Sequence, residues 1–349
     1  MKSVKIFTFC TNSSIGSILQ SFALKKALKF NDFESEILLP KPIVRKSKPN
    51  FKKTIRNFLE VFSKNKVAKA YTKRNKFISD NIDVVYYNSY NELIELTNND
   101  DTTCYLAGSD QIWNPKNCNP AFFLDFANGK KRISYAASMG ETVIPEEKKE
   151  RFVRMIQNFD SISVRESECA DAISKFTDKN IETHIDPTFL IKQSEWKSRE
   201  IEYKVKEPYI LLYMIYWDKS VKKQVKKLQK KTGLKVYTIK NGFSRAYGNK
   251  MLYDVGIEEF LWLVDHAEYV VTSSFHGVAM SAIFNKRFSA AINPDSPSRI
   301  DNLMRVLSIP KVEIDRLDDT TDNFDYDTIN ARIDEERERG LKYLREAIG

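Results

Sequence analysis

The residues best suited to chemistry in this 349-residue chain follow short apolar runs that resemble buried strands. The sharpest motif is Thr272-Ser273-Ser274-Phe275-His276-Gly277, where an apolar run leads into hydroxyls, an aromatic ring, a histidine and a glycine. A histidine at this point can donate to a phosphate or carry a proton near neutral pH. A satisfied structural histidine is the alternative, and the sequence leaves both open. No GxSxG motif occurs, which excludes a hydrolase of the Ser-His-Asp type.

Two arginines are candidates for binding an anion. Arg165 directly follows the strand-like segment 161–164 and is itself followed by Glu166. A guanidinium recognises phosphate or carboxylate through two parallel hydrogen bonds, although a simple contact with Glu166 would also explain the pair. Arg299 follows a later strand-like segment and is either a second anion-binding residue or a surface side chain.

Asp110 lies in the motif Gly108-Ser109-Asp110-Gln111-Ile112-Trp113, directly after another apolar run. Its carboxylate is a candidate for binding or deprotonating a sugar hydroxyl, with Gln111 as a hydrogen-bonding partner and Trp113 as an apolar wall. The competing interpretation is local, because an aspartate after a strand often caps a turn or a helix.

The segment 11–16 opens a helix, and Asn12 and Gly16 are its candidate anion-binding residues. Backbone N–H groups at a helix N-terminus favour an anion, and a glycine permits close approach. The segment lacks both GxGxxG and GxxxxGK[ST], so it is not a standard dinucleotide site or P-loop. An ordinary N-cap by Asn12, Ser13 or Ser14 is equally compatible with it.

The segments that must position these residues alternate between strand-like and helix-like patterns. This alternation predicts an α/β fold with mostly parallel sheets, in which ligands bind outside the carboxyl ends of the strands. A polar stretch at 193–207 divides the alternation into two series. We therefore predict two Rossmann-like domains facing a cleft, at residues 1–192 and 208–328, with a terminal helix at 329–349 packing across the outside.

Charge is concentrated in one part of the chain. The net charge is +9, yet residues 41–76 alone carry thirteen Lys and Arg against the single acid Glu60. A protein that coats nucleic acid over its whole surface is disfavoured, because the remainder is slightly acidic. Four scattered cysteines and three histidines suggest neither a disulfide framework nor a metal site. With no leader-like or membrane-spanning run, we expect a cytoplasmic protein.

Taken in order, these motifs resemble the polysaccharide pyruvyltransferase family. The matching pieces are Gly16 with Leu19-Gln20, Gly108 to Trp113, Ser163 to Glu166, Asp186-Pro187, and Ser274 to Gly277 with Arg299 downstream. Two departures stand out. Ser13-Ser14-Ile15 replaces an Asn-Tyr-Gly-like turn, and Ser274 stands where several members carry arginine.

The resemblance implies a GT-B-like fold and the transfer of pyruvate from phosphoenolpyruvate to a sugar as a ketal, with no cofactor and no metal. It makes Arg165 and His276 the donor-binding candidates, with Ser274 and Arg299 beside them. Protonated His276 is the expected acid and Asp110 the expected base. We also expect Arg165→Ala and His276→Ala to abolish turnover while leaving thermal stability nearly unchanged.

Two other functions remain open from the sequence. One is a GT-B-type glycosyltransferase that uses a nucleotide sugar, for which Tyr213, Tyr216 and Trp217 are candidate stacking residues. The other is a non-catalytic module that binds nucleic acid or anionic lipid through the basic segment.

The basic segment 41–76 is predicted to be a helical insertion on one surface of the first domain, away from the chemistry. Within it, Ile55, Phe58, Leu59 and Phe62 have the spacing of one helical face. A solvated helix is the plainest interpretation. The sharper one is a peripheral contact with anionic lipid at the inner face of the membrane, or with a lipid-linked sugar acceptor. Nucleic acid is not expected as a partner.

Overall fold

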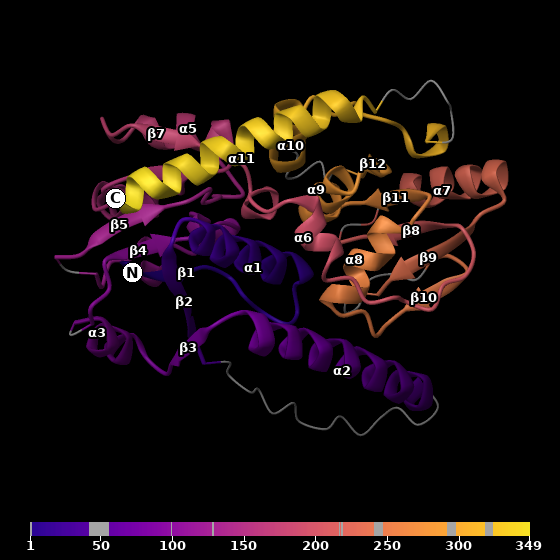
Figure 1. The fold of residues 1–349 in the computed structure, drawn as a ribbon, viewed down its shortest axis with the longest axis horizontal. Coiled ribbons are helices and arrows are strands. Elements are labelled where there is room, and N and C mark those ends of the chain that lie inside the picture. The colour runs from indigo at the N-terminus through magenta and orange to yellow at the C-terminus, as the bar shows by residue number, and fades with distance from the viewer. Residues whose placement is uncertain are drawn as a thin grey trace.

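The protein is described by a computed structural model. It covers residues 2–41, 56–98, 100–127, 129–215, 217, 219–240, 247–291, 298–317 and 324–349, with the backbone alone described at 56–65 and 298. Figure 1 shows two α/β units side by side, with the terminal helix lying across both.

The first domain is built on a five-stranded parallel sheet in the order β3-β2-β1-β4-β5. Bridges from Ile133 to Ser161 and from Ala137 to Val164 extend it to the two-stranded pair β6-β7. The strands are β1 (Lys2–Phe7), β2 (Phe33–Pro40), β3 (Val84–Tyr87), β4 (Cys104–Ala107), β5 (Lys131–Ser134), β6 (Ile162–Val164) and β7 (Ile181–Thr183).

Helices and short 3-10 turns cover this sheet. Ser14 caps α1 (Ile15–Phe30) by accepting a hydrogen bond from the Ser17 N–H, and most of α1 is buried between the sheet and the second domain. The other elements are α2 (Arg56–Asn81), α3 (Tyr90–Asn98), η1 (Gln111–Trp113), η2 (Pro120–Phe123), α4 (Glu146–Gln157), α5 (Ser167–Ser174), η3 (Pro187–Phe189) and α6 (Gln193–Lys197).

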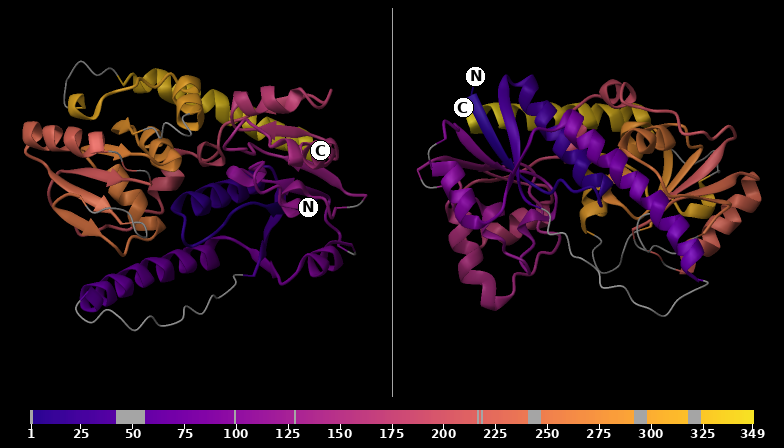
Figure 2. Two further views of the ribbon diagram at one scale, coloured as in Figure 1. Left: turned by 180° about the vertical axis from the view of Figure 1, so that it is seen from behind. Right: turned by 90° about the horizontal axis from the view of Figure 1, so that it is seen from below.

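The second domain repeats the plan with the parallel sheet β10-β9-β8-β11-β12. Its strands are β8 (Tyr209–Tyr213), β9 (Lys235–Ile239), β10 (Lys250–Leu252), β11 (Tyr269–Thr272) and β12 (Arg287–Ala290). Its helices are α7 (Lys219–Thr232), α8 (Ile257–Asp265), α9 (Phe275–Ile283), α10 (Ser298–Val306) and η4 (Ile314–Arg316). The predicted α/β fold of two Rossmann-like domains is therefore confirmed, as both panels of Figure 2 show.

The terminal helix α11 (Tyr326–Ile348) returns to pack on the first domain. The Tyr343 hydroxyl donates to the Ser134 carbonyl at 2.9 Å, and Arg337 Nε donates to the Phe189 carbonyl at 2.9 Å. The predicted packing across the outside is thus observed, although the helix begins at Tyr326 and not at residue 329.

Several elements were not predicted, among them α3, α10, the strands β3 and β10, and α6. The strands β3 and β10 lie at sheet edges and contain only four and three residues, too few to show a period-2 pattern. Helix α6 lies within the polar stretch expected to be a linker. Among the described residues, no helix combines the length and apolar character needed to cross a membrane.

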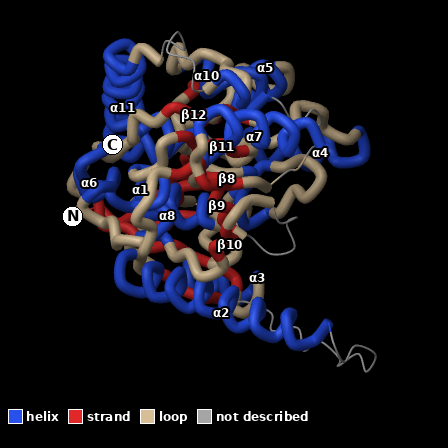
Figure 3. The backbone as a smooth tube through the Cα atoms, turned by 90° about the vertical axis from the view of Figure 1, so that its right-hand side faces the viewer, coloured by secondary structure: helices blue, strands red, loops and turns tan. Residues whose placement is uncertain are grey.

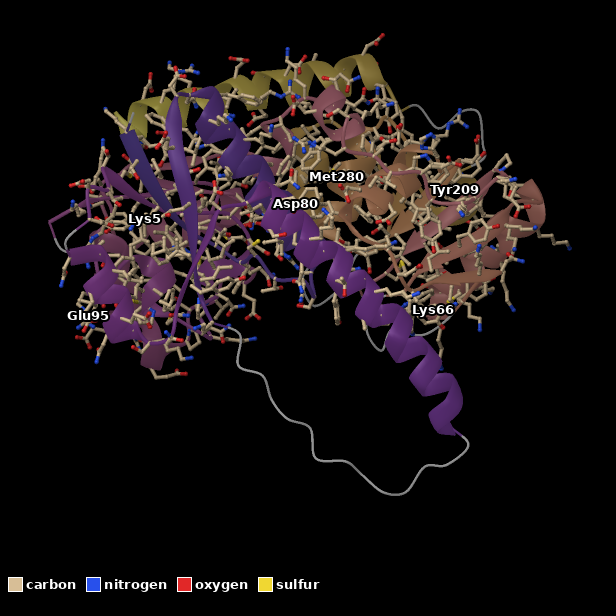
Figure 4. All side chains as sticks on the ribbon, turned by 60° about the horizontal axis from the view of Figure 1, so that its bottom comes forward. Lys5, Lys66, Asp80, Glu95, Tyr209 and Met280 are labelled. Carbon is tan, nitrogen blue, oxygen red and sulfur yellow. The ribbon has the colours of Figure 1, made fainter. Side chains whose placement is uncertain are left out.

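The prediction for the basic segment needs a correction. Its second half forms α2, while residues 42–55, including Ile55, lie outside the described residues, as do the side chains of Phe58, Leu59 and Phe62. Helix α2 does not stay on one domain but contacts both α1 and α8. Figure 3 shows its length, and Figure 4 shows it running from Asp80 beside the first domain to Lys66 beside the second.

His184 makes the stability of the α11 interface depend on pH. Its ring is buried, lies 4.5 Å from the Tyr343 ring, and is within 2.9 Å of the Ser163 hydroxyl through Nδ1. Burial, with a smaller contribution from Arg339, lowers the pKa of His184 from 6.5 to about 4. The unfolded chain therefore binds a proton at a pH where the folded chain does not, so acid favours unfolding.

As pH falls from about 6.5 to about 4, the protonation of His184 should lower the free energy of unfolding by about 2–3 kcal/mol. We predict that the free energy of unfolding of His184→Gln falls less over this pH range. Thermal or urea unfolding across this range measures it. His266→Gln, at an exposed histidine, is the matched control. An unchanged slope in His184→Gln would contradict the assignment.

Candidate active site

The candidate residues meet where the carboxyl ends of the two parallel sheets face each other. The first domain supplies the residues that follow β4, β6 and β7 and the N-terminus of α1. The second domain supplies the N-terminus of α9, directly after β11, and α10. The site is therefore shared between the domains, and its geometry depends on how they are held together.

Arg165 is a deeply buried cation of the site, with its side chain only 3% exposed. Its Nε donates to Glu166 Oε1 at 2.8 Å and its Nη1 donates to Asp186 Oδ2 at 2.9 Å, while Nη2 is buried without a partner. The Phe275 ring of the second domain lies 4.1 Å from the guanidinium carbon. The two carboxylates fix the guanidinium and leave one donor edge for a ligand.

Buried hydroxyls hold the two carboxylates in turn. Ser138 Oγ donates to Glu166 Oε1 at 3.0 Å, and Ser109 Oγ donates to Asp186 Oδ2 at 3.1 Å. The Thr188 N–H and hydroxyl both donate to Asp186 Oδ1. Apart from the Arg165–Glu166 contact, which was considered as an alternative, this network was not predicted as part of the site. Its signals in the sequence were the position of these residues after strands and the presence of Ser109, Glu166 and Asp186 in the motifs of the family resemblance.

His276 is the residue of the second domain that lies close to Asp186 of the first domain. It lies on α9, its Nε2 is 3.8 Å from Asp186 Oδ2, and this nitrogen is buried without a hydrogen-bond partner. The ring packs on Gly16 so closely that a Cβ there would lie 2.2 Å from Nδ1. The absence of a side chain at Gly16 therefore makes room for the His276 ring. The sequence had suggested instead that Gly16 contacts the substrate.

Burial and charge set the protonation of this pair. Burial lowers the pKa of His276, and although Asp186 and Asp110 act in the opposite direction, the pKa stays below its ordinary value. Burial alone would raise the pKa of Asp186, but His276 (whenever it carries a proton), the permanent charge of Arg165 and the bonds from Thr188 keep it low. In the empty site His276 is therefore mainly neutral at neutral pH, beside an ionised Asp186.

Asp110 combines local capping with backbone strain. It caps η1 by accepting from the Gln111 N–H at 2.8 Å, so the local role considered from the sequence is real. Its backbone has φ 74° and ψ 179°, a region almost restricted to glycine that costs about 1–3 kcal/mol. The Ser138 N–H holds this conformation by donating to the Asp110 carbonyl at 2.9 Å. Asp110 also acts electrostatically on Arg165, His276 and Arg299, which places it in the same cluster.

Gln111 and Arg299 meet across the two domains. In the amide orientation that suits both side chains, the Gln111 oxygen accepts from Arg299 Nη1 at 3.0 Å. Gly140, at φ 72°, leaves the room for Gln111, because a Cβ there would lie 2.5 Å from Nε2. Burial, and then the neighbouring charge of Arg165, lower the pKa of Arg299. A second cation of the site is thus held by a neutral partner.

Other predicted residues are engaged elsewhere. Ser274 is the N-cap of α9, and its hydroxyl accepts from the Gly277 N–H at 3.3 Å. The Asn12 side chain donates to Asn75 Oδ1 at 2.9 Å. Tyr213 is buried in β8 against the Phe260 ring, so it is not placed to stack on a nucleotide base. Trp217 is partly buried on the second domain, and Tyr216 lies outside the described residues.

The architecture defines the class of protein. Two Rossmann-like domains that build one site from the carboxyl ends of their parallel sheets form a GT-B-like enzyme fold. Solved structures agree. The chain resembles UDP-N-acetylglucosamine 2-epimerase from Rickettsia bellii with a TM-score of 0.55 at 8% identity, covering 99% of this chain and 97% of that one. It resembles the corresponding epimerase from Methanocaldococcus jannaschii with a TM-score of 0.54 at 10% identity, covering 96% and 92%.

A sequence comparison then gives the family. Residues 15–296 match the family described as polysaccharide pyruvyl transferase, and the chain belongs to that family. Of the residues on which the resemblance was based, only Arg299 lies outside the match. No curated protein sequence matches the chain significantly.

The buried ion pairs overturn one expectation from the sequence. Arg165→Ala would leave Glu166 and Asp186 buried without their cation, so the protein should be destabilised by roughly 3–5 kcal/mol. We predict a large drop in the thermal transition for this variant. Arg305→Ala, at an exposed arginine, provides the control and should change stability by less than about 1 kcal/mol. Equal transitions for wild type and Arg165→Ala would contradict the geometry described above.

Proposed function

We propose that this protein transfers pyruvate from phosphoenolpyruvate to two hydroxyls of a sugar, forming a ketal and releasing phosphate. One observation carries the proposal: Arg165 Nη2 and His276 Nε2, from different domains, are both buried without partners at the same site. Buried polar nitrogens are normally hydrogen-bonded, and an anionic donor would accept from Arg165 and, once it is protonated, from His276. Membership of the family supplies the reaction class.

The charge balance of the site indicates what the donor must do. Arg165 and Arg299 lie among the carboxylates of Asp110, Glu166 and Asp186, so with a neutral His276 the cluster carries no excess positive charge. A highly charged donor would therefore bind best if His276 took up a proton. The negative charge of the donor would itself raise the pKa of His276. Binding would in this way produce the acid that the reaction needs.

The residues then take the following roles. His276 gives its proton to C3 of the enol, which becomes a methyl group and leaves an oxocarbenium-like centre at C2. The first sugar hydroxyl adds to C2 as Asp110 takes its proton. The C2–O bond to phosphate breaks, and Arg165 and Arg299 stabilise the departing anion. The second hydroxyl attacks C2, loses its proton and closes the ketal.

The acceptor is proposed to be a sugar of a polysaccharide or of a lipid-linked oligosaccharide, as in envelope or capsule assembly. A lipid-linked acceptor would suit a cytoplasmic protein that touches the inner face of the membrane. Support comes from the positive charge of residues 41–76, which would attract anionic lipid or a diphosphate linkage. The donor is a substrate, and the proposed scheme uses no cofactor.

We predict acceptor-dependent release of phosphate from phosphoenolpyruvate, with pyruvyl ketal formation detected by acceptor mass. The panel should hold galactose-, glucose- and mannosamine-containing acceptors, free and lipid-linked. His276→Gln should lower kcat by about 100-fold or more, because general acid catalysis contributes on this scale. Gly16→Ala should lower it as well, because its methyl group would displace His276.

Ser13→Ala, at an exposed position of the same loop, provides the matched control and should retain activity. If no acceptor supports phosphate release while a nucleotide sugar is consumed, the glycosyltransferase alternative replaces this proposal.

A further inference from the structure

Helix α2 joins the two halves of the site through Arg74. We infer that Arg74 is a positioning residue, which holds the second domain so that His276 stays in register with Asp186 and Arg165. The residue belongs to the basic segment, whose charge had suggested only an outward-facing role. The structural part of the inference is independent of the reaction, and its effect on turnover rests on the proposed function.

Arg74 is buried, with 2% exposure, and its guanidinium spans the domain boundary. Nη1 donates to the Asn12 carbonyl at 3.1 Å, in the first-domain loop that leads into α1. Nε donates to the Val255 carbonyl at 3.1 Å, in the second-domain loop that leads into α8. A guanidinium presents several donors in one rigid plane. The Arg74 side chain can therefore bind both loops at once and hold them at a constant distance from each other.

The residues beside Arg74 make parallel contacts. Lys73 Nζ donates to the Asp254 carbonyl at 3.0 Å and pairs with Glu259 on α8. Asn75 Oδ1 accepts from the Asn12 side chain at 2.9 Å. Three consecutive residues of α2 therefore connect the loop before α1 and the loop before α8. Of these hydrogen bonds, the one from Arg74 to the Val255 carbonyl is fully buried, and burial strengthens a hydrogen bond from a charged donor.

The two loops lead directly to the catalytic contact. The first loop leads into α1, and the His276 ring packs against Gly16 of that helix. The second loop leads into α8, which packs against α9, the helix that contains His276. His276 Nε2 lies only 3.8 Å from Asp186 across the boundary. Domains within one chain move relative to each other unless the interface resists it. A small rotation would separate His276 from Asp186, and Arg74 opposes that rotation.

The three histidines of the chain provide a direct assay. His276 is 7% exposed at the boundary, His184 is 3% exposed inside the first domain, and the His266 side chain is 46% exposed. Diethyl pyrocarbonate labels accessible histidines, and peptide mass spectrometry separates the three rates. In Arg74→Met we expect His276 to be labelled at least about tenfold faster than in wild type, because hydrogen bonds from a buried charged donor are lost. His184 and His266 should keep their wild-type rates.

Lys76→Met is the control, because it removes the same charge from an exposed neighbour on α2 and should leave all three rates unchanged. Asn75→Ala, which removes a milder contact, should give a smaller rise at His276 and tests the idea if Arg74→Met folds poorly. Once turnover is established, Arg74→Met should lower kcat by about tenfold or more with little change in the KM for phosphoenolpyruvate, as expected when catalytic geometry is lost.

Two results would overturn the inference. One is an unchanged labelling rate at His276 in both Arg74→Met and Asn75→Ala. The other is an equal rise at His276 and His184, which would make Arg74 a residue of general stability. Neither result depends on phosphoenolpyruvate, so the labelling assay and the turnover assay can fail separately.

Discussion

The site depends on one buried guanidinium. Arg165 is held between Glu166 and Asp186, and the Phe275 ring of the second domain covers it at 4.1 Å. A charge can be buried in this way only when carboxylates and hydrogen bonds replace its water. Burial alone would lower the pKa of Arg165, but Glu166 and then Asp186 outweigh it and keep the residue charged. The serines behind the carboxylates and the shape of the site follow from this requirement.

A second constraint is that the site belongs to both domains. Asp186 and Arg165 follow strands of the first domain, and His276 lies on the helix after a strand of the second domain. The proposed chemistry therefore requires the two domains to keep their relative position. The close packing of His276 on Gly16, the Gln111–Arg299 contact and the α2 contacts all act at this boundary. The strained backbone of Asp110 fits the same pattern, since strain is retained where the surrounding structure fixes it.

The sequence predicted the features that depend on local pattern. Alternating strands and helices gave the two-domain fold, and the residues after strand ends included Arg165, His276, Asp110 and Gln111, which the structure places in one cluster. It could not predict relations between distant residues. The role of Asp186 as the shared partner of Arg165 and His276 depends on tertiary approach, and so does the burial of Arg74 within a run of cations. Edge strands such as β3 are too short to produce a pattern.

We propose that His276 is neutral before the donor binds and takes up the proton that makes it the acid when the donor arrives. Calorimetric titration with phosphoenolpyruvate, in buffers of different ionisation enthalpy, counts the protons taken up on binding. At mildly alkaline pH the donor phosphate is already ionised, so any uptake belongs to the protein. We expect roughly one proton to be taken up by wild type and none by His276→Gln, as linkage requires for a single group. Equal uptake by the two proteins, or binding by wild type without uptake, would contradict the account.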